Sequence, residues 1–250
     1  MNITTDINIL GGLPDWELVK VFLTGSVETM KSRGGTHSFT QIKTEKSVKR
    51  FEKAIKQSLL KFSNKNLELL FHKLLNDKGI CNETLLVLFW NGSLNNDLLH
   101  YLNDKVYFPA LYSGRTSLKN DEVEACLKEL QATNNQIASW SDITIATTAS
   151  KYLTLLKKFT LLEGGQKKSI NHPLLDDAVF VLFIYWLSGI SEKANLIDSP
   201  WLNYAFSERK HLIDKLLQKK FSKFYNVTYL GDKLTIETTV PYAELYDKLY

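Results

Sequence analysis

Apolar residues recur along most of this chain with the spacing of an α-helix. In segment 43–65 they line one side of a predicted helix, at Val48, Phe51, Ile55, Leu59 and Phe62. A second stripe follows Ser141 or Asp142, either of which is a suitable N-cap, and consists of Ile145, Ala149, Tyr152, Leu156 and Phe159. Capping residues and apolar stripes predict further helices over 15–30, 64–76, 82–90, 121–131, 173–187 and 200–220. The chain is therefore predicted to be mainly helical.

Alternating β-forming residues stand out only near the C-terminus. Segments 225–230 and 233–239 flank Gly231 and Asp232, so they predict a hairpin with a tight turn. No strand is expected before Thr133, and segment 107–119 is expected to be an irregular connection. The predicted fold class is mainly α, with helical domains that contain winged-helix-like units and a C-terminal β-hairpin.

Two domains are predicted from this order of elements. The N-terminal helical domain, residues 1–132, would contain the helix of segment 43–65. The C-terminal domain, residues 133–250, would combine helical or winged-helix-like units with the hairpin. A chain of 250 residues, 44% of them hydrophobic, is long enough to bury a substantial core in either arrangement.

The composition is that of an ordinary globular protein, with 23% charged residues. Because the net charge is only +4, any binding to an acidic polymer has to come from clustered cations. Neither the two cysteines nor the five histidines have the spacing of metal ligands. No metal site and no cofactor are therefore predicted.

One strongly apolar run, residues 178–187, is about half as long as the roughly 20 residues needed to cross a bilayer. It follows Asp176 and Asp177 and is predicted to be a buried helix rather than a membrane anchor. Residues 1–13 lack the basic start and apolar stretch of a secretory signal. The protein is therefore expected in the cytoplasm, without membrane insertion.

The clearest functional signal is a local excess of cations. Eight Lys or Arg residues lie between Lys43 and Lys65, against only Glu45 and Glu52. On a helix, the side opposite the apolar stripe carries Lys46, Lys49, Arg50 and Lys53. A row of cations favours phosphate binding, because each neutralised phosphate releases condensed counterions. A lysine-rich helix face that is merely solvated is the competing interpretation.

The helix predicted after Ser141 has a polar side with hydroxyls and cations that can follow a nucleic-acid backbone: Thr147, Lys151, Thr154 and Lys158. Gln166, Lys167 and Lys168 then precede Ile170, so a basic turn and a short strand follow the helix. This order is a weak winged-helix signal, and an amphipathic core helix with a polar outer face explains it equally well.

A third basic cluster precedes and adjoins the C-terminal hairpin. Its members are Arg209, Lys210, Lys215, Lys219, Lys220 and Lys223. The hairpin is either a purely structural element or a wing that enters a nucleic-acid groove.

Sequence motifs of the common enzyme classes are absent. There is no phosphate-binding loop, nucleophile elbow, zinc-protease motif or dinucleotide-binding glycine pattern. A metal-dependent nuclease that uses Asp232 and Glu237 is the remaining catalytic alternative, but Thr239 stands where such nucleases place a lysine. No catalytic residue is predicted, and the protein is expected not to be an enzyme.

The order of these features resembles the BrxA family of bacteriophage exclusion (BREX) systems. The resemblance covers residues 16–170. It rests on the amphipathic helix over 15–30, the basic segment TEKSVKRFEKAIKQSLLKF, and a central Trp-Ser-Asp-x-Thr helix that runs to Leu-Leu-Glu-Gly-Gly. It implies a small, helical, non-enzymatic component of an antiphage defence system that is associated with double-stranded DNA.

We therefore expect sequence-tolerant docking on the backbone of double-stranded DNA, with other BREX proteins as further partners. The predicted DNA-binding residues are Lys43, Lys46, Lys49, Arg50, Lys53, Thr147, Lys151, Thr154, Lys158, Lys167 and Lys168. The alternative is a helical adaptor that binds acidic subunits of the defence complex without touching DNA, through aromatic anchors at Tyr107, Phe108, Tyr112, Trp186 and Trp201. RNA is a further ligand that the sequence does not separate from DNA.

Overall fold

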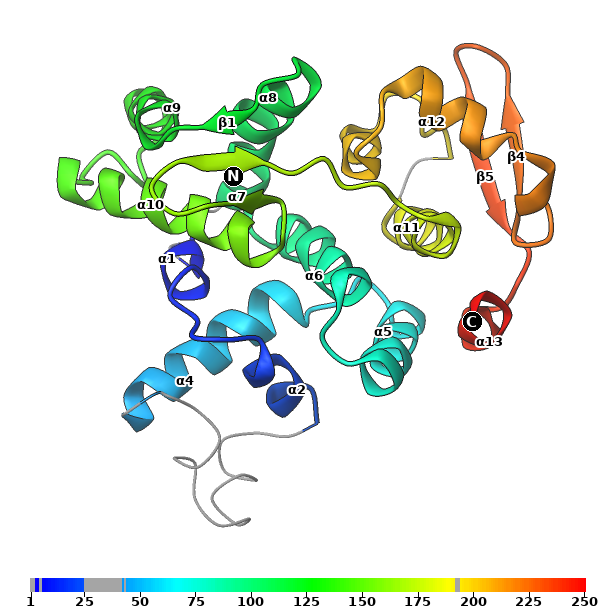
Figure 1. Ribbon diagram of the computed structural model, residues 1–250, viewed down its shortest axis with the longest axis horizontal. Helices are drawn as coiled ribbons and strands as arrows, with labels where there is room; N and C mark the ends of the chain where they lie inside the picture. Colours follow the sequence, from blue (N-terminus) through cyan, green and yellow to red (C-terminus); the bar gives the residue numbers. More distant parts are fainter. Residues whose placement is uncertain (1–2, 5, 25–41, 43, 192–193) are drawn as a thin grey trace. The chain divides into compact units, whose positions relative to one another are not determined.

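Helices dominate this chain, whose structure is a computed structural model that describes residues 3–4, 6–24, 42, 44–191 and 194–250 (Figure 1). The described residues confirm a mainly α fold with an antiparallel hairpin near the C-terminus. The chain forms two compact units. Unit 1 comprises residues 1–61 and 80–172, and unit 2 comprises residues 62–79 and 173–250.

Unit 1 is built from two stretches of the chain, which are separated by residues 62–79 of unit 2. In chain order its helical elements are α1 (Asp6–Leu10), α2 (Glu17–Thr24), α4 (Glu45–Ala54), the π-helical turn η2 (Ile55–Leu59), α6 (Asn82–Asn95), α7 (Asp97–Leu102), a second π-helical turn η3 (Asn103–Tyr107), α8 (Phe108–Tyr112), α9 (Asn120–Thr133) and α10 (Asp142–Lys158).

The core of unit 1 forms around α6. Residues 84–93 of this helix are all buried, as expected of a helix that is apolar on nearly every side. Phe89 packs edge-on against Phe159, at the end of α10, with ring centroids 5.5 Å apart. The side chain of Asn103 is buried, and its amide oxygen accepts a hydrogen bond of 3.0 Å from the hydroxyl of Tyr152 in α10. Apolar packing and a satisfied polar contact therefore both hold α10 in the core.

Three short strands pack at the end of α10. β1 (Ser117–Leu118), β2 (Leu162–Glu163) and β3 (Lys168–Ile170) form an antiparallel sheet in the order β1–β3–β2. Ser169 pairs with both Ser117 and Glu163, so β3 is the central strand. The elements thus follow one another as α8, β1, α9, α10, β2 and β3, and the turn of residues 164–167 joins the last two strands.

Unit 2 is a smaller helical body with the C-terminal hairpin. Its elements are α5 (Lys65–Lys78), α11 (Asp177–Ile190), the 3-10 helix η4 (Pro200–Ala205), α12 (Arg209–Leu216), the 3-10 turn η5 (Lys219–Phe221), β4 (Tyr225–Tyr229), β5 (Leu234–Thr238) and α13 (Tyr242–Leu249).

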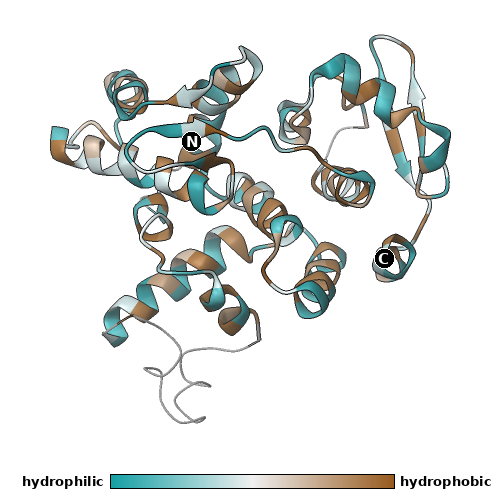
Figure 2. Cartoon of the chain, in the orientation of Figure 1, coloured by the Kyte–Doolittle hydropathy of each residue, from teal (hydrophilic) through white to brown (hydrophobic). Residues whose placement is uncertain are grey.

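The predicted buried helix at 178–187 is confirmed as α11. Every residue from Val179 to Leu187 is buried, and Figure 2 shows α11 largely in the brown of hydrophobic residues. Tyr185 donates a hydrogen bond of 2.7 Å to the carbonyl of Phe224 and accepts one of 3.1 Å from the backbone N–H of Val240. These two bonds hold both ends of the hairpin on α11. In the part of the chain that is described, no helix combines the length and the apolarity that crossing a membrane requires.

The predicted hairpin is also confirmed. Tyr225 pairs with Thr238 and Tyr229 with Leu234, in antiparallel register. Gly231 has a φ of 83°, which is accessible to glycine without a steric penalty, and the N–H of Leu230 bonds to the carbonyl of Lys233 at 2.9 Å. The sequence located this element because both the strands and the turn have local signatures.

Two expectations for the middle of the chain are wrong. Segment 107–119 is not irregular, because it contains α8, which continues directly from η3 and carries Pro109 at its second position. A strand does occur before Thr133, namely β1. This strand is only two residues long and exists because β3, about 50 residues later in the chain, supplies its hydrogen-bonding partner.

The boundary predicted between residues 132 and 133 falls at the end of α9, inside unit 1. The two helices that it would separate, α9 and α10, pack against each other. The units instead divide near residues 61, 79 and 172, where the chain passes from one body to the other.

Candidate nucleic-acid interface

α4 places its predicted cations on the outside of unit 1. Thr44 caps the helix by accepting a hydrogen bond of 3.2 Å from the N–H of Ser47. Val48 and Ala54 are buried, while the four predicted cations are exposed: Lys46, Lys49, Arg50 and Lys53. Figure 2 shows the corresponding alternation of brown and teal along α4. We call these four side chains the α4 cation face.

The end of this basic helix is held in place by asparagines of α6. The apolar stripe continues to Leu59 in the π-helical turn η2, whereas Phe62 lies beyond the helix, in unit 2. Asn91 donates hydrogen bonds of 2.9 and 3.0 Å to the carbonyls of Leu59 and Lys61, and Asn95 donates one of 2.7 Å to the carbonyl of Lys61. The open carbonyls at the helix end are therefore satisfied by side chains of the core.

Three members of the α4 cation face have no carboxylate partner among the described residues. Lys49 lies 3.6 Å from Glu45, but no described Asp or Glu lies within ion-pair distance of Lys46, Arg50 or Lys53. Together with Glu45 these side chains line a shallow depression of about 570 Å³. Such cations are available to an external anion. Lys43, also predicted to bind DNA, lies outside the described residues.

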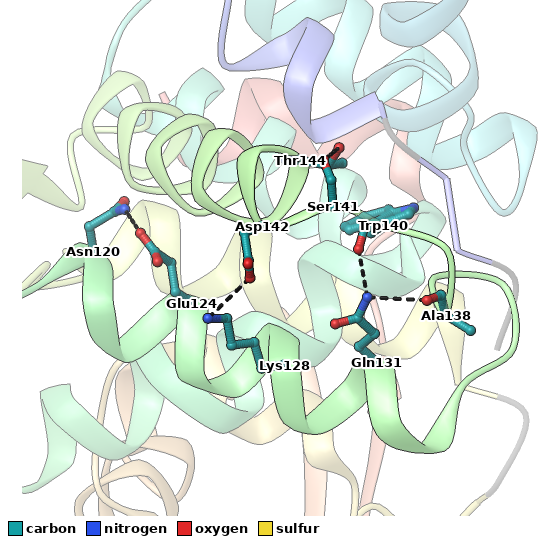
Figure 3. A network of polar contacts seen from close by, with 9 residues as sticks. All are labelled: Asn120, Glu124, Lys128, Gln131, Ala138, Trp140, Ser141, Asp142 and Thr144. Atoms are coloured by element: carbon teal, nitrogen blue, oxygen red, sulfur yellow. Dashed lines mark hydrogen bonds and ion pairs between the residues drawn. The ribbon is translucent and has the colours of Figure 1, made fainter.

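α10 is held at its N-terminal end by α9 and the turn of residues 134–141 (Figure 3). Ser141 caps α10 by accepting a hydrogen bond of 3.2 Å from the N–H three residues later. Gln131 of α9 donates a hydrogen bond of 2.7 Å to the carbonyl of Trp140. Lys128, also on α9, lies 3.2 Å from the carboxylate of Asp142. These contacts set the direction of the first turn of α10 relative to α9.

The buried stripe predicted for α10 is confirmed, since all five of its members are buried: Ile145, Ala149, Tyr152, Leu156 and Phe159. The N-terminal segment, however, covers part of the predicted polar side of α10, around Lys151 and Lys158. Gly11, after α1, sits directly against the backbone of Lys151, where a methyl group would overlap with the carbonyl oxygen. Both Lys151 and Lys158 are consequently only half-exposed.

Lys158 makes specific contacts with the segment that follows α1. Its ammonium group donates a hydrogen bond of 2.5 Å to the carbonyl of Leu13, and its own carbonyl accepts one of 3.0 Å from the indole of Trp16. Burial lowers the pKa of Lys158, because the charged form loses hydration. This lysine therefore has a structural role in addition to any contact with a ligand.

The exposed side of α10 carries residues that the sequence reasoning missed. Ile143, Ser150 and Lys157 are exposed along with the predicted Thr147. The hydroxyl of Thr154 donates a hydrogen bond of 2.8 Å to the carbonyl of Ser150, so its proton is used within the helix. Positions 143, 147, 150 and 154 have the helical spacing i, i+4, i+7 and i+11, and this pattern could have identified the stripe from the sequence.

The basic turn that follows α10 lies next to the last turn of the helix. Lys157 donates a hydrogen bond of 2.7 Å to the carbonyl of Gly164. Lys167 is exposed, whereas Lys168 is half-buried in β3, where burial lowers its pKa and the charge of Lys157 lowers it further. The structure thus brings Lys157, Lys167 and Lys168 together at one end of α10.

Gly164→Ala is expected to lower the free energy of unfolding by about 1–3 kcal/mol, because this turn requires a left-handed residue. Gly164 has a φ of 89°, and an added Cβ would overlap with the carbonyl oxygen of Lys167. Gly165→Ala is the matched control, since a Cβ there meets no atom within 4 Å. Urea denaturation of both variants checks the expectation. Equal losses of unfolding free energy in the two variants would contradict the left-handed conformation of Gly164 and its close approach to Lys167.

Most of the aromatic anchors proposed for an adaptor lie in the core. Tyr107, Phe108 and Trp186 are buried, so they are not available to a partner. Tyr112 and Trp201 are half-buried and pack against neighbouring rings, with centroids 6.1 Å from Phe108 and 5.0 Å from Tyr204, respectively. The aromatic surface on which the adaptor hypothesis relied is therefore much smaller than predicted.

The two carboxylates of the nuclease alternative are far apart on the hairpin. Asp232 lies in the turn, whereas Glu237 pairs with Asn226, five residues further along an extended strand, which corresponds to roughly 16 Å. Over the described ranges, no three His, Cys, Asp or Glu side chains gather closely enough to share a metal ion.

Comparison with known protein families finds a match to the family described as BrxA over residues 17–184. This range covers more than half of the chain and includes the α4 cation face, α9, α10 and the small sheet. No curated protein and no solved structure matches the chain.

Proposed function

The chain belongs to the BrxA family of bacteriophage exclusion systems, and we propose that within such a system it acts as a non-enzymatic, cytoplasmic protein that binds double-stranded DNA. Docking takes place on the phosphate backbone and is tolerant of sequence. Other proteins of the BREX system are its further partners.

The α4 cation face is the observation that carries this proposal. Four exposed cations on one side of a short helix, three of them without a carboxylate partner among the described residues, form a row of positive charge. Neutralising phosphates with such a row releases condensed counterions, which favours binding without reading any base. The asparagines of α6 support the proposal, since they hold the end of this helix against the core.

A second DNA contact is proposed for the elements from α8 to β3, as a winged-helix unit. In this unit α9 and α10 form the helix-turn-helix, β1 joins the sheet, and the turn of residues 164–167 is the wing. Thr147 would bond to phosphate on the exposed side of α10, and Lys157, Lys167 and Lys168 would contact the backbone from the wing end. Lys151, Thr154 and Lys158 are less accessible and would contribute less.

Binding to a short random duplex is expected to weaken steeply with salt. Because each neutralised phosphate contributes about −0.9 to the slope of log affinity against log salt, the four cations of the α4 face alone predict a slope of about −4, and the three lysines at the wing bring it to about −6. Fluorescence anisotropy at several salt concentrations measures this slope. Absence of binding at low salt would overturn the proposal and favour the adaptor. Tighter binding to duplex RNA of the same sequence would identify RNA, rather than DNA, as the preferred ligand.

A further inference from the structure

The exposed stripe of α10 differs in chemistry from the α4 cation face. Ile143, Thr147 and Ser150 are exposed, Thr154 is half-exposed, and none of them carries a charge. Ile143, in the first turn of the helix, has 79% of its surface exposed. The uncharged stripe spans about three turns, and its cation, Lys157, lies only at the far end, next to the wing.

These side chains have no charge to attract phosphates, and their apolar groups suit the floor of the major groove. There the C5-methyl group of thymine is the one apolar feature, and it is contacted by small apolar groups and by the methyl group of threonine. In a helix-turn-helix, the N-terminal residues of the second helix are the ones that reach the base edges. Ile143 and Thr147 occupy the first two turns of α10.

The surroundings of Ile143 are compatible with such an approach. The adjacent carboxylate of Asp142 would repel DNA, but Lys128 lies 3.2 Å from it and offsets its charge. The contacts of α9 and of the turn hold this end of α10 in one direction (Figure 3). The stripe is therefore presented on a helix whose start is fixed, as base contact requires.

From this arrangement we infer that Ile143 and the methyl group of Thr147 contact thymine methyl groups in the major groove, so that binding is biased toward sites with A·T pairs. The inference rests on the proposed DNA binding and adds a base preference to it. The hydroxyl of Thr147 keeps the phosphate contact proposed above.

The test compares two duplexes of the same sequence, one with thymine and one with uracil in its place, at equal salt. The two differ only in the C5-methyl groups, so the charge and the hydrogen-bonding edges are unchanged. The wild-type protein is expected to bind the thymine duplex about fourfold more tightly for each methyl group that it contacts. Fluorescence anisotropy competition measures the ratio directly.

A double variant, Ile143→Ser with Thr147→Ser, removes the methyl groups of both side chains from the protein side and keeps the hydroxyl at position 147. It is expected to bind the two duplexes with equal affinity. Both residues are exposed, so thermal unfolding should be unchanged. A variant that still prefers thymine would overturn the assignment of these two residues.

The remaining outcomes separate this inference from the proposed function. Salt-sensitive binding with no preference between the two duplexes would overturn the base contact and leave backbone docking in place. Failure of the wild-type protein to bind either duplex would overturn both.

Discussion

Reversal of the α4 cation face, with Lys46, Lys49, Arg50 and Lys53 all changed to Glu, is expected to weaken binding to duplex DNA by about 100-fold or more at low salt. The change removes four phosphate contacts and adds four charges that the DNA backbone repels. Folding should be preserved, because these side chains are exposed and the one ion pair that joins them to a described carboxylate, Lys49 with Glu45, is solvent-exposed and contributes little stability. Fluorescence anisotropy gives the affinity, and circular dichroism checks the fold.

A control with the same change in net charge uses exposed lysines outside the α4 cation face: Lys61, Lys65, Lys105 and Lys119. This variant should lose much less affinity, because only the long-range part of the electrostatic attraction changes. An equal loss in both variants would attribute binding to overall charge. Unchanged affinity in the α4 variant would remove the proposed docking site.

Gly11→Ala is expected to destabilise the protein by about 2–4 kcal/mol, the largest stability effect that we predict. The added Cβ would overlap with the carbonyl oxygen of Lys151 and lie 3.0 Å from the Lys151 carbonyl carbon. These atoms belong to the backbone of α10 and cannot rotate away. The N-terminal segment would have to move outward, which would expose the buried side chains of Ile7 and Leu10 and break the bond of 3.1 Å from Asn8 to Thr148.

The neighbouring glycine provides a matched control. Gly12 is exposed, and a Cβ there would lie 3.3 Å from the carbonyl oxygen of Ile9, which a small shift relieves. Gly12→Ala should therefore change the free energy of unfolding by less than about 1 kcal/mol. Urea denaturation of the two variants measures the difference. Two similar values would contradict the close approach of Gly11 to α10.

Periodicity in the sequence was sufficient to predict the elements in which local signals agree. The capped amphipathic helices α4 and α10, the buried helix α11 and the β4–β5 hairpin all follow from spacing, capping residues and turn residues. These are properties of neighbouring residues, so no knowledge of the rest of the chain is needed. The outward direction of the α4 cations follows in the same way, since Val48 and Ile55 determine which side of the helix is buried.

The small sheet could not be predicted from local sequence, because its strands pair across distant parts of the chain. β1 and β2 are each only two residues long, too short to show alternation, and they exist because β3 pairs with both. The same holds for α8, where Pro109 suggests a break in the helix, although the helical backbone continues through it from η3. A short element is stabilised by its partner, and its own sequence carries little signal.

The sequence by itself determined a mainly helical chain and the cations of α4, because helical periodicity decides which residues share a face. Only the tertiary structure decided which of the polar residues of α10 are accessible. The N-terminal segment packs on the flank that contains Lys151 and Lys158, and it leaves Ile143, Thr147 and Ser150 exposed. Which side of a helix is covered depends on the segment that packs there, and that contact joins residues about 140 positions apart.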